Sequence, residues 1–174
     1  MRRRELLQKK SAIVDGYEYV DMGNNLLWAK CNIGAENEYE LGTTYKWGAT
    51  KANGVEYQTI NVKTLPLSAD TARQVMGGGW RMPTSAECKT LLDACKKTIV
   101  NVNNKSCWEL SVGNKSLIFY TSGATSLFWT SSSNGNAGTY SAKGVSGNSS
   151  TQKVVIGDYS RSNTKMPVRG VHEK

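Results

Sequence analysis

The sequence predicts a single α+β domain in which short antiparallel strands are combined with two helices. Its 174 residues, 39% of them hydrophobic, suffice for one compact core and leave little room for a second. Apolar residues alternate or cluster over short runs between turn residues, as in half-buried strands. Two other stretches carry start and stop signals of helices. We therefore expect one domain at residues 15–174, preceded by a basic N-terminal tail at residues 1–14.

Strands are expected in both halves of this domain. In the N-terminal half they cover residues 17–22 and 26–33, with the turn residues Gly23, Asn24 and Asn25 between them. In the C-terminal half, short apolar runs predict strands at residues 117–120, 127–130, 153–156 and 166–171.

The two helices are predicted from their capping residues. The first covers residues 68–76, with Ser68 as N-cap and Gly77 as the stop signal. The second opens with the capping box Thr84-Ser85-Ala86-Glu87. It is expected to run to about Lys97, because basic side chains suit the negative C-terminal end of a helix.

The positive charge of the chain is unevenly placed. The formal net charge is +8, and it comes from residues 1–10 and 143–174, while residues 11–142 balance to zero. A nucleic-acid-binding protein usually spreads positive charge along one face, with aromatic residues between. We therefore expect no nucleic-acid partner.

The N-terminal residues indicate where the protein is made. Residues 1–10 contain no apolar stretch long enough for a signal peptide. No run in the chain approaches the roughly 20 apolar residues of a membrane helix. We expect synthesis in the cytoplasm without a signal peptide, no membrane insertion, and a final place in a phage tail or in the cytoplasm.

Residue types that catalyse reactions or bind metals are scarce. The only histidine, His172, is expected at the surface, so a Ser/His or Cys/His dyad is not predicted. Glu36, Glu38 and Glu40 lack the Asp/Asn ladder of a calcium loop and predict a solvated acidic loop. The cysteines form no CxxC pair and are expected to be buried free thiols; they are Cys31, Cys88, Cys95 and Cys107. We expect no enzymatic activity, no metal and no cofactor.

The stretch 130–151 differs from the rest of the chain in composition. Seventeen of its 22 residues are Ser, Thr, Gly or Asn. A flexible linker has this composition. However, strands are predicted on both sides, at Trp129 and Val154, and a polar loop held at both ends on a scaffold is typical of binding loops.

A ligand-binding surface is therefore predicted within residues 132–163. Tyr, Ser, Gly and Asn are the residues that antibody loops use, because they combine rigid contact area with adaptable hydrogen bonding. Tyr140 and Tyr159 are the expected anchors, with Arg161, Lys143 and the Asn side chains adding polar specificity. The candidate residues are Ser132, Ser133, Asn134, Asn136, Thr139, Tyr140, Lys143, Asn148, Asp158, Tyr159, Arg161 and Asn163.

Seven blocks, in order, resemble a known family. They are Tyr19-Val20-Asp21-Met22-Gly23, Leu27-Trp28-Ala29-Lys30-Cys31-Asn32-Ile33-Gly34-Ala35, Tyr45-Lys46-Trp47-Gly48, Gly78-Gly79-Trp80-Arg81-Met82-Pro83-Thr84, Leu91-Leu92-Asp93-Ala94-Cys95, Phe128-Trp129-Thr130-Ser131-Ser132 and Val168-Arg169-Gly170-Val171. Together they resemble the major paralogous domain family of Fibrobacter and Bacteroidetes, which is related to the formylglycine-generating enzymes. This resemblance implies a C-type-lectin-like domain over about residues 17–171.

The resemblance does not carry every activity of related proteins. The sugar-binding motifs of calcium-dependent lectins are absent from the chain. The paired cysteines of the formylglycine-generating enzymes are not recognisable either. Neither calcium-dependent sugar binding nor formylglycine formation is therefore expected.

The polar C-terminal stretch also resembles the variable proteins of diversity-generating retroelements, in which a reverse transcriptase rewrites adenine positions near the end of a gene. This resemblance implies a non-enzymatic receptor-binding display protein of a phage or prophage, with a diversified C-terminal surface. Its partner would be a protein or glycan receptor on a cell surface, and it would form a homo-oligomer or join a tail-protein assembly. The alternative is a fixed structural or adhesive module of a tail or fimbria-like assembly.

Overall fold

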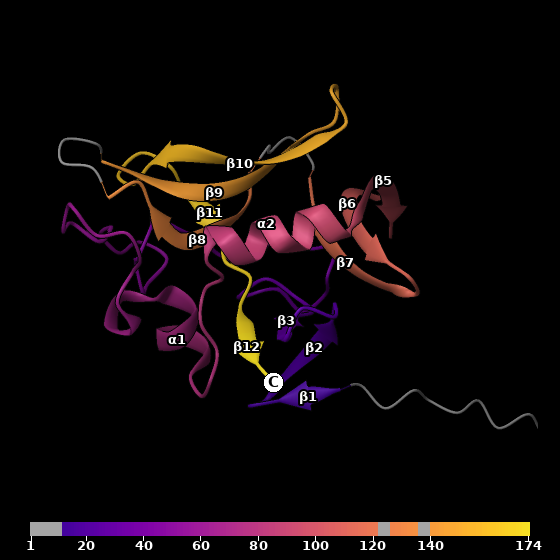
Figure 1. Cartoon of the computed structure of the whole chain (residues 1–174), viewed down its shortest axis with the longest axis horizontal. Helices are drawn as coiled ribbons and strands as arrows, with labels where there is room; N and C mark the ends of the chain where they lie inside the picture. Colours follow the sequence, from indigo (N-terminus) through magenta and orange to yellow (C-terminus); the bar gives the residue numbers. More distant parts are fainter. Residues whose placement is uncertain (1–11, 122–125, 136–139) are drawn as a thin grey trace, which may run out of the picture.

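The computed structural model describes residues 12–121, 126–135 and 140–174. Within these residues the strands form four antiparallel sheets, and two α-helices and one short 3-10 helix pack beside them (Figure 1). The predicted tail, residues 1–14, overlaps the first strand, whereas residues 1–11 lie outside the described part of the chain.

One sheet brings together strands from the beginning and the end of the described chain. In sheet order its strands are β1 (Ile13–Val14), β2 (Tyr17–Asp21), β3 (Leu26–Ala29) and β12 (Val171–Glu173). Trp28 lies between Val20 of β2 and Val171 of β12 in the register. The predicted turn after β2 is present, with the Gly23 amide donating to the Asp21 carboxylate at 2.9 Å. The second predicted strand is shorter than expected, because β3 ends at Ala29.

A second sheet consists of two successive tight hairpins. Its strands are β5 (Lys96–Val102), β6 (Lys105–Val112) and β7 (Lys115–Tyr120). Asn103 and Asn104 form the two-residue loop between β5 and β6, with φ angles of 48° and 61°. Two positive φ angles match the right-handed twist of a hairpin, and asparagine tolerates them. Only β7 was predicted from the sequence.

The third sheet corrects the prediction of a loop over residues 130–151. Its strands are β8 (Ser126–Ser133), β9 (Ser141–Asn148) and β10 (Lys153–Ser160), with β9 in the middle. Glycines in β9 let bulky side chains approach the backbone: a Cβ atom at Gly144 would lie 2.6 Å from Met166 Sδ, and Gly147 lies against the Trp108 indole. The strand is therefore rich in small residues because its neighbours fill the space. A short pair, β4 (Thr44–Tyr45) with β11 (Met166–Pro167), completes the strands.

The helices are η1 (Leu67–Ala69), α1 (Thr71–Met76) and α2 (Ser85–Ala94). Asp70, rather than the predicted Ser68, caps α1, because its carboxylate accepts from the amide of Arg73 at 2.9 Å. The predicted capping box of α2 is confirmed: Thr84 Oγ1 accepts from the Glu87 amide, and Glu87 Oε2 accepts from the Thr84 amide. The helix does not reach Lys97, since β5 begins at Lys96.

The α+β prediction, with its C-type-lectin-like domain, is wrong for this structure. Among the described residues, strands account for 42% and helices for 12%, so this part of the chain is mostly β. The expected number of α-helices is correct among the described residues. The error comes from β5 and β6, whose apolar residues around Ile99 and Trp108 were not recognised as strands, and from β9, which is rich in Ser, Gly and Asn. These residue types are weak strand signals, and tertiary packing overrides them here.

The core consists of two hydrophobic clusters. In one, α2 contributes Leu91 and packs against the β6–β7 and β8–β10 sheets through residues such as Trp108 and Phe128. In the other, Trp47 and Trp129 pack between β4, β8 and β11. All five tryptophans of the chain are fully buried, which makes them the largest contributors to apolar burial.

A buried arginine, Arg169, lies beside the end of β3. Arg169 is fully buried, and its guanidinium lies 4.2 Å from the centre of the Phe119 ring. Burial lowers its pKa to about 10. Among the described residues, no carboxylate lies within ion-pair distance of it. Instead it donates to four oxygen atoms, those of the Asn32 side chain and of the Ala29, Lys30 and Ile118 backbone.

The α2 capping box provides a measurable pH dependence. Arg81 donates to both oxygens of Glu87, at 2.7 and 2.9 Å. Burial raises the pKa of Glu87, but the hydrogen bonds from Arg81 and Thr84 outweigh it, so the net shift is downward. A carboxylate with a lowered folded-state pKa stabilises the fold above its unfolded-state pKa, and this contribution is lost as the pH falls through the folded value.

We therefore expect Glu87→Gln, which keeps the capping box, to cost about 1 kcal/mol at pH 7. Urea unfolding of both proteins should show this difference shrinking as the pH is lowered through the acid range in which Glu87 becomes protonated. Asp93→Asn is the control, because Asp93 pairs with Lys89 on the exposed face of the same helix, and its effect should stay below about 0.5 kcal/mol. A difference for Glu87→Gln that does not change with pH would contradict the prediction.

Other expectations about single residues are partly corrected. Cys88, Cys95 and Cys107 are buried free thiols as predicted, whereas Cys31 is partly exposed. His172 is mostly buried rather than superficial, because its ring packs edge-on against Trp80 and Nε2 lies 3.0 Å from an Asp15 oxygen. In the described ranges we find no helix with the length and apolarity to cross a membrane.

Candidate functional site

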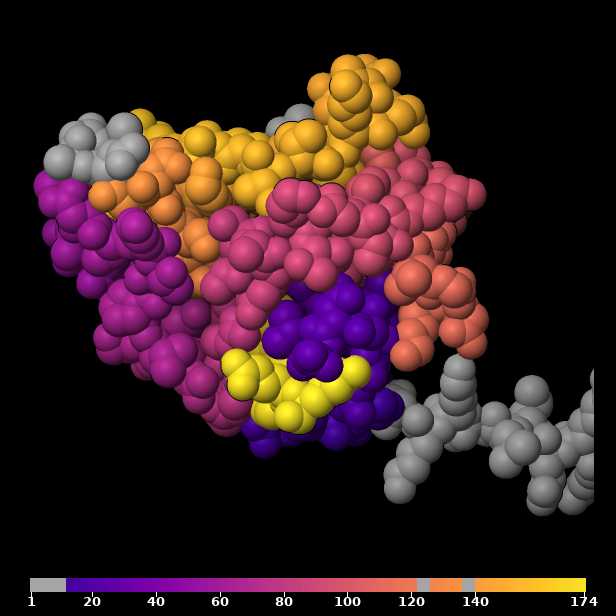
Figure 2. Space-filling model, in the orientation of Figure 1, coloured from indigo at the N-terminus to yellow at the C-terminus, as the bar shows by residue number. Residues whose placement is uncertain are grey.

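The predicted ligand residues lie on the β8–β10 sheet and its flanking turns, but the structure separates them. Asn148 lies at the turn that joins β9 to β10, and this turn projects from the body of the molecule (Figure 2). Most of the others lie at the opposite end of the hairpin, where β9 begins and β10 ends. Asn136 and Thr139 lie outside the described residues.

Two of the predicted residues are buried and hold other parts of the chain. The Ser132 hydroxyl accepts from the Ser85 amide at the start of α2, at 2.9 Å. The Ser133 hydroxyl donates to the carbonyl of Val62, and its amide donates to the carbonyl of Lys63. Both side chains are less than 10% exposed. They join β8 to its neighbours and are not available to a ligand in this structure.

Arg161 is also buried, with 1% of its surface exposed. Its guanidinium lies 4.2 Å from the centre of the Trp47 ring and 5.5 Å from that of Tyr140. It donates to the backbone carbonyls of Ser141, Tyr57 and Thr59. Arg161 therefore connects the hairpin to the irregular segment 50–63.

Tyr140 is a half-buried residue at the boundary between the hairpin and this segment. Its hydroxyl donates to Glu56 Oε1 at 2.9 Å, and Lys46 Nζ lies 3.7 Å from the other Glu56 oxygen. Burial, and then the hydrogen bond to the Glu56 carboxylate, raises the pKa of Tyr140. Tyr140 is therefore partly exposed, while its hydroxyl is held by Glu56.

The remaining predicted residues form an exposed or half-exposed polar rim. Lys143 and Asp158 face each other across β9 and β10, with Nζ and Oδ1 3.2 Å apart. Tyr159 packs its ring edge-on against the buried Trp129. Asn134 Nδ2 donates to the Ser141 hydroxyl. Asn163 is exposed in the turn after β10.

We call Tyr140, Lys143, Asp158, Tyr159 and Asn163 the hairpin-end surface. It offers a cation and a carboxylate, Lys143 and Asp158, on one face of the hairpin, whereas Tyr159 lies on the opposite face, partly packed on the second core cluster. Such a surface can bind a ligand through hydrogen bonds and ring contacts. Among the described residues, no three His, Cys, Asp or Glu side chains are placed to hold a metal ion.

Sequence reasoning missed the contribution of segment 50–63. Figure 2 shows it at the left edge of the molecule, beneath the end of the β9–β10 hairpin. Its signal was weak, because the segment has no periodicity and its role depends on backbone carbonyls that accept from Arg161. Only the apolar Tyr57 and Val62, which pack on the second core cluster, indicate that it is held in place.

Comparison with protein-family models, curated proteins and solved structures finds no match for this chain. The resemblance to the major paralogous domain family therefore stays a prediction.

The separation into buried and exposed positions predicts different tolerance to substitution. Replacing Asp158 and Asn163 together with alanine should change the free energy of unfolding by less than about 1 kcal/mol, because both are exposed. Ser132→Ala should cost about 1–2 kcal/mol, because it removes the acceptor of the Ser85 amide. Urea unfolding measures both, and equal effects of the two changes would contradict this description of the surface.

Proposed function

We propose that this protein is a non-enzymatic display protein, which binds a protein or glycan receptor on a cell surface through the hairpin-end surface. The observation that carries the proposal is the contrast between fixed and free positions. Arg161, Ser132 and Ser133 hold the backbone from beneath, whereas Lys143, Asp158 and Asn163 extend from it without a role in the core. The exposed side chains of such a surface can be replaced without unfolding the protein.

This contrast supports the further proposal of a diversified surface in a phage or prophage protein. Diversification requires positions at which almost any side chain is tolerated, and exposed residues on a rigid scaffold meet that requirement. Tyr140 and Tyr159 supply the partly open aromatic area that binding surfaces use. The proposal places variation at the hairpin-end surface and in the turn at Asn148, and excludes it at Arg161.

Sequencing the same locus in sibling isolates tests this proposal. We expect differences at adenine-derived codons of the exposed positions, such as Lys143, Asp158 and Asn163. The codons of Ser132 and Arg161 should stay unchanged. Differences scattered evenly over the chain, or absent from residues 131–163, would overturn the diversification.

Binding is tested directly with the fluorescently labelled full chain and whole bacterial cells. The triple variant Tyr140→Ser, Lys143→Ala, Asp158→Ala should lose at least ten-fold in affinity, since interface centres contribute most of the binding energy. The double change Lys89→Ala, Asp93→Ala, on the exposed face of α2, is the control and should leave binding unchanged. Binding that survives the triple change would show that another surface is used.

A second candidate is a fixed structural or adhesive module of a tail or fimbria-like assembly. The burial of Ser132, Ser133 and Arg161 favours it, because these predicted ligand residues serve the fold. Two results together would support this module and exclude a diversified protein. The hairpin-end residues would be identical in all sibling isolates, and the protein would co-purify with an assembled particle.

A further inference from the structure

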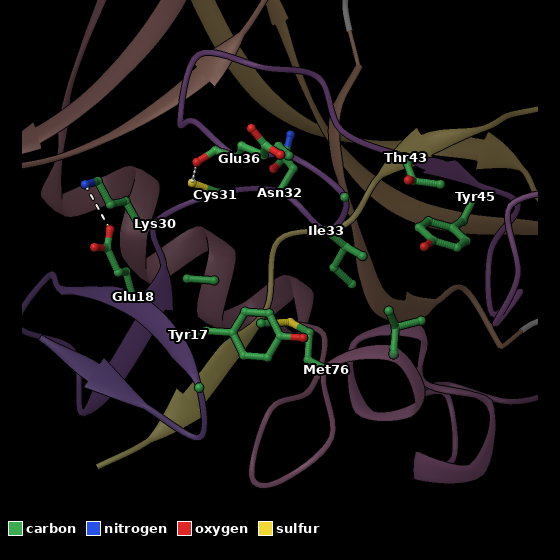
Figure 3. A pocket seen from close by; sticks show the side chains of 15 residues that line it. Tyr17, Glu18, Lys30, Cys31, Asn32, Ile33, Glu36, Thr43, Tyr45 and Met76 are labelled. Atoms are coloured by element: carbon green, nitrogen blue, oxygen red, sulfur yellow. Dashed lines mark hydrogen bonds and ion pairs between the residues drawn. The ribbon is translucent and has the colours of Figure 1, made fainter. Parts of the chain in front are cut away.

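A cavity of about 420 Å³ opens between β2, the chain that follows β3, and α1 (Figure 3). None of the residues predicted to bind a ligand lines it. Its volume falls in the range of roughly 300–1,000 Å³ that small-molecule sites occupy. It is therefore a concave site separate from the hairpin-end surface.

The wall of the cavity is mainly apolar. Tyr17 and Val75 stand at the surface, with 39% and 38% of their area exposed, and Met76 and Ile33 lie further in. In Figure 3 the Tyr17 ring lies across Met76. When an apolar ligand covers exposed aromatic and aliphatic side chains beside a cavity, their surface is removed from water, which lowers the free energy.

Of the charged groups at the cavity, Lys30 and Glu18 pair with each other, whereas the Glu36 carboxylate makes no ion pair among the described residues. Lys30 Nζ lies 3.0 Å from a Glu18 carboxylate oxygen at one end (Figure 3). The Asn32 side chain donates to the carbonyl of Leu41 and accepts from the buried Arg169. A negatively charged ligand would lose hydration here without gaining a free cation, because the lining cation Lys30 is already paired.

The walls are held in shape by packing behind them. The Tyr17 ring packs edge-on against the fully buried Trp80, with the ring centres 6.0 Å apart. Met76 lies against Gly170, where a Cβ atom would be 2.7 Å from its sulfur. A ligand would therefore meet a preformed cavity, which reduces the entropy cost of binding.

We propose that this cavity binds an uncharged, mainly apolar small molecule, with an aromatic or aliphatic body against Tyr17, Val75 and Met76. The partly exposed Cys31 thiol lines the same cavity, whereas the other three cysteines are buried. The proposal does not depend on receptor binding by the hairpin-end surface. Cys31 serves as a reporter of occupancy.

Two fluorescent probes that share an aromatic body test the proposal on the full chain. N-phenyl-1-naphthylamine is neutral, and 8-anilinonaphthalene-1-sulfonate carries a sulfonate. We expect the neutral probe to bind with one-to-one stoichiometry and a Kd of about 10 μM. The charged probe should bind at least ten-fold more weakly. No saturable binding of the neutral probe, or equal binding of both, would overturn the proposal.

Variants locate the binding. Val75→Trp places a large ring at the mouth of the cavity and should weaken the neutral probe at least ten-fold. Val155→Trp is the matched control, because Val155 is an exposed valine on β10, and it should leave the affinity unchanged. Saturating neutral probe should slow the reaction of Cys31 with a disulfide reagent at least five-fold, with Cys31→Ser as the blank. Unchanged affinity in Val75→Trp, or an unchanged rate at Cys31, would place the probe elsewhere and overturn the proposal.

Discussion

Replacing Arg169 with methionine is expected to lower the free energy of unfolding by about 3–5 kcal/mol. Methionine fills much of the same volume but cannot donate. The change leaves the Asn32 side chain and the Ile118 carbonyl, among others, without the donor that now satisfies them in a buried place. Unpaired buried acceptors are costly, because water cannot replace the lost hydrogen bond.

The matched control for this change is Lys105→Met. Lys105 also lies over aromatic rings, with Nζ 5.6 Å from the centres of Tyr39 and Tyr120, but these contacts lie nearer the surface. Its loss should therefore cost less than about 1 kcal/mol. Urea unfolding at pH 7 compares the variants, and a cost below about 1.5 kcal/mol for Arg169→Met would contradict the assigned role.

Lysine should not rescue Arg169. A guanidinium presents five donors in a planar fork, whereas an ammonium is a compact charge on a flexible stem. The four acceptors of Arg169 come from the end of β3 and the chain beyond it, and from β7. We expect Arg169→Lys to retain less than half of the stability that Arg169→Met loses.

Arg161→Ala is expected to lower the free energy of unfolding by about 2–4 kcal/mol. It is also expected to destabilise segment 50–63 more than the rest of the fold. The change removes three hydrogen bonds to carbonyls and the contact with the Trp47 ring. Since two of these carbonyls belong to Tyr57 and Thr59, segment 50–63 loses two of the hydrogen bonds that join it to the hairpin.

Hydrogen exchange measures this local effect. In Arg161→Ala, the amides of residues 57–63 should exchange at least ten-fold faster than the loss of global stability accounts for, while those of α2 change only in proportion to that loss. Lys143→Ala is the control, because its ion pair with Asp158 is half exposed and is worth about 0.2–1 kcal/mol. Unchanged exchange in segment 57–63 would show that Arg161 does not hold it.

The parts of the fold that were predicted from the sequence are those with local signals. The capping box at Thr84 and Glu87 marks the start of α2 because both hydrogen bonds lie within one turn. Strand β2 was found from its alternating polarity. The cap of α1 was misplaced by two residues, because Asp70 is selected by its additional hydrogen bonds from the amide of Met82, 12 residues away.

The candidate site was harder to predict, because several of its polar residues are buried, whereas residues of these types are usually exposed. An arginine in a polar stretch is normally exposed, yet Arg161 is buried against Trp47. Serines in such a stretch indicate a loop, yet Ser132 and Ser133 lie in β8. These outcomes depend on side chains far away in the sequence, and a single sequence does not reveal them. Asp158 and Asn163 are exposed, as their residue types alone indicate.

The sheet order β1-β2-β3-β12 has a consequence for how fast the protein folds. Trp28 pairs with Val171, so the central strand of this sheet must find a partner more than 140 residues along the chain. Bringing the ends of so long a loop together costs conformational entropy before any favourable contact has formed, and such topologies fold slowly. During synthesis this sheet remains incomplete until Val171 has been added. Until then the apolar edge of β3 is open to pairing with other chains, which is the period when aggregation competes with folding.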